Sequence, residues 1–346
     1  MTVDERICAF KTLSSSLYDA AETPQTDNSE LKRQTDQEYI YNPWFIPVFV
    51  RAAIVSLAKM LSGNNLEQWI LPYRDALAGN RKSLRTGVIT AGNIPLVGFH
   101  DFLSVLIAGD TFVGKLSSKD DRLLPLIAEM LCRIEPRFSD KIEFCSGKLS
   151  PVDRVIATGS NHSANIFSHY FQKYPSIIRK HCNSIAVLDG NETGKDLLKL
   201  ADDVFLYFGL GCRSVSKIYV PFHYDFTALF HALDVYKEIL SQHHTYLNNL
   251  EYQKTVHLLN AVAFLDQGIC IFKEETALNS PVGVIHYQYY DTVKQLVDSI
   301  LFRQENIQCI VSNALVHPLV SPLGESQHPK LNNYANGIDI MQFLTC

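Results

Sequence analysis

The spacing of hydrophobic and polar positions changes along this chain, and the changes predict where helices and strands lie. The first 38 residues are polar and predict helical turns and loops that cover another part of the protein. From Trp44 to Leu61 the residues become apolar with spaced small side chains, which predicts a buried helix. Pro47 falls in the first turn of that helix, where proline is tolerated.

Beyond residue 85, strand-like runs alternate with helical stretches. The expected strands are 86–91, 111–115, 152–158 and 185–188, and the expected helices are 102–108, 123–134, 163–173 and 195–205. Strands separated by helices of this length imply crossover connections and a parallel sheet, with right-handed crossovers. The pattern therefore predicts an open, doubly wound α/β domain.

A second α/β stretch follows, and no Gly/Pro/Ser linker marks the boundary near Tyr207. Its expected strands are 217–220, 269–272, 283–287 and 309–312, with helices at 225–242 and 292–302. We expect an α/β protein in which a larger domain is packed on a second, smaller one. The predicted boundaries are 1–84 for an N-terminal helical cover, 85–206 and 207–320 for the two domains, and 321–346 for a C-terminal tail.

Composition limits the classes of function. Of the 346 residues, 47% are hydrophobic and 19% charged, which is typical of a folded protein. The net charge of −5 gives no support for nucleic-acid binding. No run predicts a membrane span, and the start MTVDERICAF lacks the order of a secretory signal, so a cytoplasmic location is expected. Eight dispersed cysteines without a CxxC pair predict no metal site, but one of them is a candidate nucleophile.

The most informative segment is Phe205–Val220, FLYFGLGCRSVSKIYV. A helix is expected to run into Phe208, glycines then break it, and Cys212 precedes a strand. Glycines allow unusual backbone angles, so such a turn can present the thiol, and nearby positive charge or N–H groups favour the thiolate. The alternative is a buried structural cysteine in a tight turn.

Three other polar segments follow predicted strands. Asn93 in TAGNIPLVG is a candidate donor to an oxyanion, or alternatively caps a turn. Lys115 ends a strand, where ligands bind in open α/β sheets. Gly159 and Ser160 in ATGSNHS begin a helix, which suits phosphate binding and equally suits ordinary N-capping.

The order and spacing of these residues resemble the aldehyde dehydrogenase superfamily, in which an Asn near a Pro, a strand-ending Lys, a Gly-Ser helix start and a Gly-flanked Cys follow one another. KEETALNSPVGVIHY resembles the family segment whose Glu meets the nicotinamide ribose, which implies Glu275, with Glu274 as the alternative. PLGESQHPKLNNYANG is loosely similar to the C-terminal Gly-rich segment. GLGCRSVSKIYVP is most similar to the acyl-CoA reductase branch, which includes the reductase of the bacterial luminescence fatty-acid reductase complex.

The resemblance covers about residues 85–325 and implies a role for each domain. Residues 85–206 would bind the dinucleotide, with 1–84 as part of that domain, and residues 207–320 would be catalytic. It implies Cys212 as the nucleophile and Asn93 as the oxyanion donor. The implied cofactor-binding residues are Lys115, Ser118, Gly159, Ser160 and Glu275.

Two departures from the family pattern refine the expected chemistry. Hydrolytic members carry a Glu in an ELGG motif before the Cys, but the comparable stretch Pro175–Val187 has no carboxylate. A thioester on Cys212 should therefore resist water and react with a thiol such as coenzyme A, or be reduced. NAD-preferring members carry a Glu where this chain has Ser118, followed by Lys119, which favours NADPH while NADH remains possible. The alternative is a solvated loop.

We therefore expect an NAD(P)H-dependent acyl-CoA reductase that acts on acyl-CoA or another acyl thioester. The alternatives are an oxidising aldehyde dehydrogenase and a non-catalytic subunit that retains the fold. A homo-oligomer or an acyl-transfer partner protein is possible, and neither nucleic acid nor a membrane span is expected. Other features are interpreted as structural: a solvated His243-His244 pair, core residues Cys182 and Cys270, and an edge strand at Tyr287, Tyr289 and Tyr290.

Overall fold

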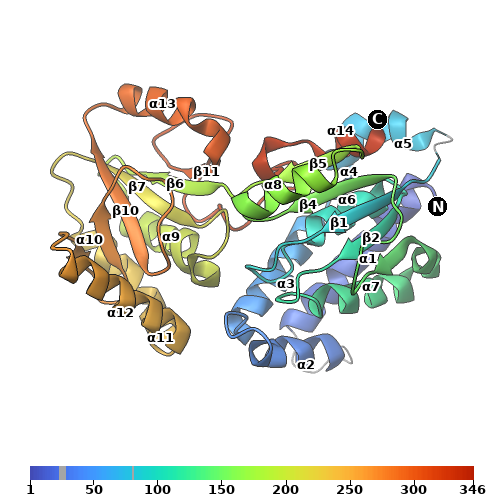
Figure 1. The fold of residues 1–346 in the computed structure, drawn as a ribbon, viewed down its shortest axis with the longest axis horizontal. Helices are drawn as coiled ribbons and strands as arrows, with labels where there is room; N and C mark the ends of the chain where they lie inside the picture. Colours follow the sequence, from blue (N-terminus) through green and yellow to red (C-terminus); the bar gives the residue numbers. More distant parts are fainter. Residues whose placement is uncertain (23–28, 80–81) are drawn as a thin grey trace. The chain divides into compact units, whose positions relative to one another are not determined.

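The computed structural model describes residues 1–22, 29–79 and 82–346 (Figure 1). They form two compact units, which are described separately. The first contains Met1–His181 and Lys330–Cys346, and the second contains Cys182–Pro329. Each unit is built on a sheet of mainly parallel strands, as the alternating pattern predicts.

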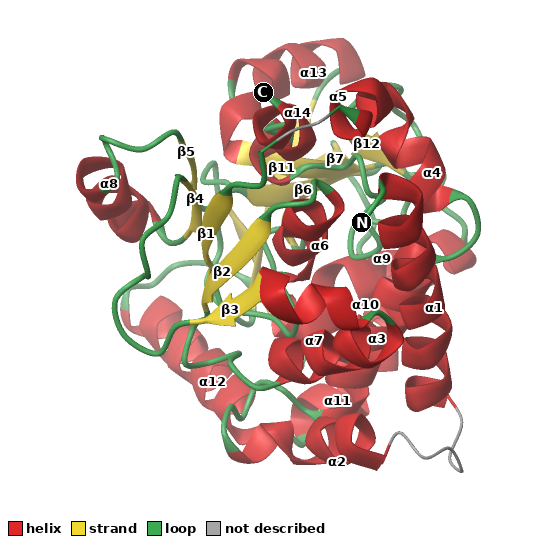
Figure 2. Cartoon of the chain, turned by 90° about the vertical axis from the view of Figure 1, so that its right-hand side faces the viewer, coloured by secondary structure: helices red, strands yellow, loops and turns green. Residues whose placement is uncertain are grey.

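The first unit contains a five-stranded sheet in the order β3-β2-β1-β4-β5, in which every pair is parallel. The strands are β1 Arg85–Ile89, β2 Thr111–Lys115, β3 Ile142–Phe144, β4 Arg154–Thr158 and β5 Ser176–Arg179. The connecting helices are α6 Phe99–Ile107, α7 Leu123–Ile134 and α8 Asn161–Tyr170. Figure 2 shows α8 on one face of this sheet and α6 and α7 on the other, so the sheet is doubly wound.

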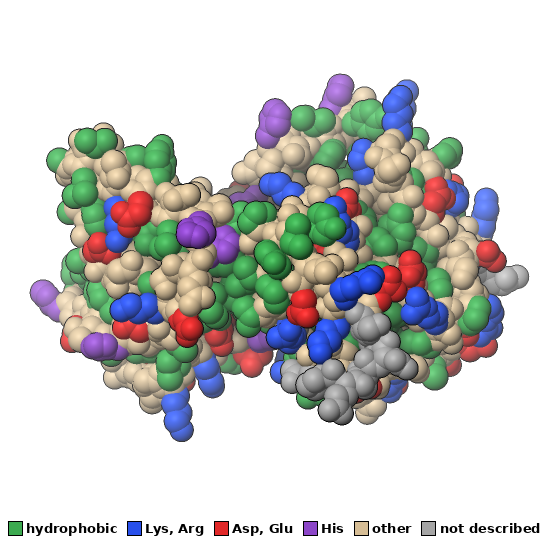
Figure 3. All heavy atoms as spheres, turned by 90° about the horizontal axis from the view of Figure 1, so that it is seen from below, with side chains coloured by type: hydrophobic (Ala, Val, Ile, Leu, Met, Phe, Trp, Pro, Cys, Tyr) green, Lys and Arg blue, Asp and Glu red, His purple; other side chains and the backbone are tan. Residues whose placement is uncertain are grey.

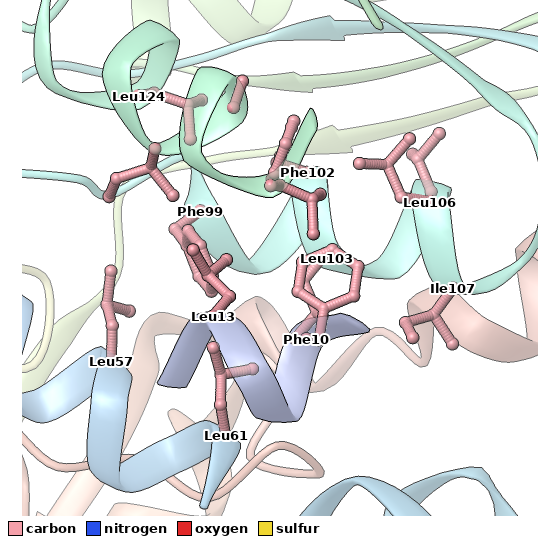
Figure 4. Close-up of a cluster of buried hydrophobic side chains, with 14 of the residues drawn as sticks. Phe10, Leu13, Leu57, Leu61, Phe99, Phe102, Leu103, Leu106, Ile107 and Leu124 are labelled. Carbon is pink, nitrogen blue, oxygen red and sulfur yellow. The ribbon is translucent and has the colours of Figure 1, made fainter. Parts of the chain in front are cut away.

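Further helices of the first unit form its core with α6 and α7. They are α1 Val3–Glu22, α2 Ser29–Gln37, α3 Pro47–Leu61, α4 Asn65–Ile70, α5 Arg74–Ala78 and α14 Ile340–Thr345, with short 3-10 turns at Glu38–Ile40, Leu71–Tyr73, Pro136–Lys141 and Ala335–Gly337. Phe10 of α1 and Phe102 of α6 are fully buried, with ring centroids 6.4 Å apart (Figure 4). The polar N-terminal stretch thus contains a long helix whose apolar side belongs to the core.

The C-terminal residues join the first unit through a buried charge pair. Arg154 on β4 bonds to Asp110, and both side chains are almost fully buried. The same guanidinium donates to the carbonyls of Phe343 and Leu344, each at 2.8 Å. The expected tail at 321–346 is therefore divided, since residues up to Pro329 belong to the second unit.

The second unit contains a seven-stranded sheet in the order β12-β11-β6-β7-β10-β9-β8, parallel except for the β8–β9 pair. The strands are β6 Asn183–Val187, β7 Val215–Pro221, β8 Leu265–Asp266, β9 Ile271–Glu274, β10 Val284–Tyr290, β11 Ile307–Val311 and β12 Val320–Ser321. The helices are α9 Gly194–Phe205, α10 Thr227–Leu233, α11 Lys237–Ser241, α12 His244–Leu259 and α13 Val293–Phe302, with 3-10 turns at Leu206–Gly209, Asp234–Tyr236 and Gln304–Asn306.

One strand was assigned to the wrong sheet. Residues 185–188 were expected in the first sheet, but β6 pairs with β7 and β11 of the second. The place next to β4 is taken by β5, which the sequence analysis missed because SIIR is a short run between a proline and polar residues. The division between the units consequently falls at Cys182, whereas the expected boundary was 206/207.

Three smaller expectations are corrected. The helix expected at 225–242 is α10, a 3-10 turn and α11. The tyrosine-rich β10 is an interior strand between β7 and β9, because both of its edges are paired. His243 is buried and caps α12 by accepting from the Tyr246 N–H at 3.1 Å, although His244 is exposed as expected. Cys182 and Cys270 are buried, which confirms their structural interpretation.

Candidate active site

The carboxyl edge of the first sheet brings several predicted site residues together. The chain leaves β1 toward β2 on one side and returns to β4 on the other, which makes the β1–β4 boundary a topological switch point. Loops that follow the strands at such a point diverge and leave a crevice for ligands. Asn93 follows β1, Lys115 ends β2, and Gly159 and Ser160 follow β4.

The loops after β1 and β2 approach each other closely. A Cβ at Gly92 would lie 2.5 Å from Ser117 Oγ, so this approach requires glycine. The Ser117 N–H also donates to Thr90 Oγ1 at 3.2 Å. Lys115 is half-buried, and its ammonium donates to the Gly147 carbonyl at 2.8 Å, whereas Ser118 is exposed.

Ser160 begins α8 as its N-cap. Its Oγ accepts from the Ser163 N–H at 3.2 Å, which is the capping role that the sequence left open. Gly159 is required by packing, because a Cβ there would lie 2.8 Å from Ser163 Cβ. Ser160 is exposed, and the N-terminus of a ten-residue helix favours anions through its N–H groups.

These features fit a dinucleotide at this edge. Gly92 and Gly159 allow close packing against the side chains of Ser117 and Ser163, and an ammonium ends β2. The hydroxyls of Ser118, on the loop after β2, and Ser160, at the start of α8, are on exposed residues. The chemistry of this donor set suits phosphate and ribose oxygens.

Asp120, which the sequence analysis did not single out, holds the loop that carries Asn93. Its Oδ2 accepts from the Leu96 N–H at 2.8 Å, and Leu96 has a left-handed φ of 59°. Burial, together with the nearby Glu38 carboxylate, raises the pKa of Asp120 to about 7. An Asp before a helix ordinarily indicates an N-cap, so nothing in the sequence marked this contact.

The stretch Pro175–Val187, which lacks the Glu of hydrolytic members, contributes Arg179 to a buried ion pair. Arg179 at the end of β5 donates from Nη1 to both carboxylate oxygens of Asp101, at 2.7 and 2.8 Å. Both side chains are less than a tenth exposed. The Arg179 guanidinium thus neutralises the buried Asp101 carboxylate.

Cys212 follows a strained turn in the second unit. Helix α9 ends at Phe205, as the predicted bounds 195–205 have it, and it does not run on into Phe208. Tyr207, Phe208 and Gly209 are left-handed with φ of 57°, 58° and 71°. Such angles cost roughly 1–3 kcal/mol for each non-glycine residue and persist where packing enforces them. Phe208 is fully buried, and the centroid of its ring lies 4.2 Å from the centroid of the His243 ring.

The Cys212 side chain differs from those of the structural cysteines. It is half-buried in a turn closed by the Ser214 N–H and the Gly211 carbonyl at 3.0 Å. Its own carbonyl accepts from Ser184 Oγ at 2.9 Å. Cys182 is buried, which raises the pKa of that thiol to about 11. Cys212 is thus less buried than Cys182, and its role as the nucleophile stays a prediction.

Glu275 directly follows β9 and is held as a carboxylate. Its Oε2 accepts from Lys273 Nζ at 2.9 Å, and its Oε1 accepts from the Thr276 N–H at 2.8 Å. The hydrogen bond from Lys273 lowers the pKa of Glu275 to about 2. Glu274, the alternative residue, is exposed.

The Gly-rich segment at the end of the second unit is anchored beside the Cys212 turn. Asp203 on α9 accepts from the N–H groups of Gly324 and Ser326 at 2.6 and 2.9 Å. Gln327 donates to Ser214 Oγ at 3.0 Å. Burial raises the pKa of Asp203 to about 6.

Residues 1–22, 29–79 and 82–346 offer neither a metal site nor a membrane-spanning helix. They contain no group of three His, Cys, Asp or Glu side chains placed to hold a metal ion. None of the helices in this part of the chain has the length and hydrophobicity to cross a membrane. On the face drawn in Figure 3, basic and acidic side chains are interspersed.

Comparison with solved structures defines the class of fold. Aldehyde dehydrogenase 21 from Physcomitrella patens, in complex with the reaction product succinate, matches with a TM-score of 0.69 and 13% identity, covering 100% of this chain and 84% of that one. An NAD-dependent aldehyde dehydrogenase from Sinorhizobium meliloti matches with 0.64 and 13%, covering 94% and 72%. An indole-3-acetaldehyde dehydrogenase complexed with NAD+ matches with 0.61 and 14%, covering 95% and 74%. The protein therefore has the two-domain α/β fold of aldehyde dehydrogenases.

The sequence then identifies the family within that class. The model of the acyl-CoA reductase (LuxC) family matches residues 82–310, and the chain belongs to this family. No curated protein sequence matches the chain. Family and fold together confirm the resemblance and make the protein an oxidoreductase of the acyl-CoA reductase or aldehyde dehydrogenase type.

Proposed function

We propose that this protein is an NADPH-dependent acyl-CoA reductase that converts an acyl thioester to an aldehyde through a covalent thioester on Cys212. Family membership supports the substrate class. The single structural observation that supports the nucleophile is the partial burial of Cys212, three residues after the left-handed run 207–209. A strained backbone next to a reactive group is typical of functional sites.

In the first half of this reaction, the Cys212 thiolate attacks the carbonyl carbon of the acyl thioester. The new carbon–sulfur bond forms to Cys212, the bond to coenzyme A breaks, and coenzyme A leaves as a thiolate. The Asn93 side-chain amide and the Cys212 backbone N–H are the proposed donors to the tetrahedral oxyanion. One such donor contributes on the order of 3 kcal/mol to transition-state stabilisation.

The proposed cofactor-binding residues divide by chemistry. Lys115 and the α8 start at Gly159 and Ser160 suit phosphate oxygens, and Glu275 suits ribose hydroxyls. Ser118 and the exposed Lys119 tolerate a 2′-phosphate that a carboxylate would repel, which favours NADPH over NADH. When bound, the reduced nicotinamide supplies the hydride that turns the acyl group on Cys212 into an aldehyde.

The absence of a carboxylate from Pro175–Val187 supports an acylating enzyme over an oxidising aldehyde dehydrogenase. A hydrolytic enzyme needs a carboxylate free to take a proton from water. Pro175–Val187, the stretch comparable with the one that carries this carboxylate in hydrolytic members, contains none. A non-catalytic subunit remains the second alternative, and Cys212, Asn93 and Lys115 occurring together argue against it. The cytoplasmic location and an oligomer or acyl-transfer partner stay predictions from the sequence.

The proposal is tested by exposing the protein to acyl-CoA without any reduced cofactor. We expect an intact-mass increase of one acyl group on the wild type, its removal on addition of coenzyme A, and no increase on Cys212→Ser. A positioned base accelerates proton transfer by ~10²–10⁴-fold, so its absence should leave the adduct long-lived in buffer. Rapid loss with free acid appearing would favour the oxidising enzyme, and no adduct at all would favour the non-catalytic subunit.

A further inference from the structure

The backbone after Glu275 is held by side chains at four successive carbonyls. Lys217 Nζ donates to the carbonyls of Glu275 and Thr276, each at 2.9 Å. His286 Nδ1 lies 3.1 Å from the Ala277 carbonyl, so it carries the proton. Ser216 Oγ donates to the Leu278 carbonyl at 2.8 Å. Neighbouring residues of β7 and a residue of β10 thus set the path of segment 275–278.

Lys217 is the central member of this group. Its side chain is fully buried, and its third donor contact is to Gln288 Oε1 at 2.7 Å. The ammonium also lies 4.8 Å from the centroid of the Tyr219 ring. A buried ammonium is costly unless every donor is satisfied, and here three acceptors match its three protons. Two of those acceptors belong to the Glu275 segment, so the lysine and this segment hold each other.

The same side chain connects two parts of the proposed site. β7 begins three residues after Cys212, and Lys217 is its third residue. Glu275 immediately follows β9, two strands away in the sheet. The contacts of Lys217 with the Glu275 backbone leave the carboxylate of that residue to its own partners, Lys273 and the Thr276 N–H.

We propose that Lys217 is a positioning residue, which holds segment 275–278 so that the Glu275 carboxylate is preorganised for the ribose of the cofactor. This inference rests on the proposed function, because it needs Glu275 to be a cofactor-binding residue. Preorganisation increases affinity by removing the ordering cost from the binding step. Loss of the lysine should therefore weaken cofactor binding without a direct contact between Lys217 and the cofactor.

Because of the charges around Lys217, the affinity for the cofactor is expected to depend on pH. Burial and the Arg303 guanidinium lower the pKa of Lys217 to about 8, and the Glu275 carboxylate acts in the opposite direction. Arg303 donates to the Thr276 carbonyl at 3.2 Å, and His286 and Tyr219 are the other titratable groups beside the ammonium. Above pH 8 the Lys217 side chain is mainly a neutral amine, which has two N–H donors for its three acceptors. Affinity for the reduced cofactor should fall between pH 7 and pH 9.

The test measures the Kd of NADPH, and of NADH, by nucleotide fluorescence on the full-length protein without acyl-CoA. Lys217→Met should weaken binding at pH 7 at least about tenfold and remove the fall above pH 8. Lys217→Arg, which stays charged, should keep part of the affinity and lose the pH dependence. The matched control is Lys254→Met, which removes a mostly buried lysine that pairs with Asp266 at 3.0 Å. It should change neither the Kd at pH 7 nor the pH dependence of the Kd.

A double variant separates positioning from general damage. If Lys217 acts through Glu275, then Lys217→Met with Glu275→Gln binds no more weakly than the more affected single variant. Additive losses, or a Lys217→Met protein that binds like the wild type, would overturn the inference while leaving the proposed function intact. If Lys217→Met does not fold, a wild-type Kd that is flat from pH 7 to pH 9 overturns it instead. A wild type that binds neither nucleotide would overturn both.

Discussion

The two units hold their candidate site residues in different ways. In the first unit, Ser118 and Ser160 are exposed, and Ser160 bonds only a few residues along its own helix, to Ser163. In the second unit, Cys212 and Glu275 are bound through their carbonyls by side chains from distant parts of the chain, Ser184 and Lys217.

The difference matches the tasks that we propose for the two regions. A cofactor that must enter and leave is served by exposed groups on loops at a sheet edge. A nucleophile that forms and breaks bonds must be placed accurately, and buried hydrogen bonds from several strands supply that placement. Loss of Cys212 in the second unit should therefore affect chemistry most strongly, and changes at Ser118 on the edge of the first sheet should mainly affect cofactor choice. Asn93 at that edge and Glu275 in the second unit are the proposed exceptions to this division.

The largest expected effect follows the loss of the nucleophile. Cys212→Ser should reduce turnover on the order of 10³-fold or more, because a serine hydroxyl is hardly ionised near neutral pH. The thermal unfolding midpoint and NADPH affinity should stay close to those of the wild type. Cys132→Ser, at another partly buried cysteine, is the control and should keep full activity. Substantial turnover by Cys212→Ser would disprove the proposed roles of the two regions.

Asn93→Ala tests whether a residue of the first unit also serves the chemistry. Loss of an oxyanion donor should lower kcat about 10²–10³-fold with little change in the KM for cofactor. Asn64→Ala, at an exposed position of the same unit, should have no effect on either parameter. A changed KM with normal kcat would assign Asn93 to binding and make the contrast between the regions sharper.

Asp120→Asn tests the support of the Asn93 loop through the pH dependence of stability. Burial raises the pKa of Asp120 to about 7 in the folded state, against an ordinary value of 3.8. Between those values the unfolded chain loses the proton first, so the unfolding free energy of the wild type falls as pH rises toward 7.

The fall attributable to this residue is about 3 kcal/mol from pH 5 to pH 8. Asp120→Asn stays neutral and keeps an acceptor for the Leu96 N–H, so it should lack this part of the pH dependence. Urea unfolding at several pH values measures it, with the exposed Asp140→Asn as control. Parallel curves for Asp120→Asn and wild type would show that Asp120 is ionised in the folded protein.

The smallest effect is expected at the exposed edge of the first sheet. Ser118→Glu introduces a carboxylate that repels a 2′-phosphate and can accept from ribose hydroxyls. The ratio of kcat/KM for NADPH to that for NADH should fall about tenfold, with kcat for NADH nearly unchanged. Ser139→Glu adds the same charge at another exposed position and should leave the ratio as it is. An unchanged ratio in Ser118→Glu would remove Ser118 from the cofactor site.

Much of the fold could be predicted, because the local pattern of hydrophobic and polar residues determines where most strands and helices lie. β2 and α7 have the predicted bounds, Thr111–Lys115 and Leu123–Ile134, since strongly apolar periodicity dominates in both. The membership of β6 was not predictable in the same way. A buried strand has the same run of hydrophobic residues whichever sheet it belongs to. Only the pairing of β6 with β7 and β11 shows which sheet it joins.

The sequence alone determined the order of strands and helices, the family, and the candidate residues that follow strand ends, because those signals are local or lie in motifs. The tertiary structure alone revealed the partners of those residues: Arg179 on Asp101, Asp120 on the Leu96 N–H, and Lys217 on the Glu275 segment. These contacts join residues far apart in the chain, and a charged residue in a strand or loop pattern is ordinarily expected to face solvent. Which polar groups are buried, and against which partners, is a property of packing that composition and periodicity do not contain.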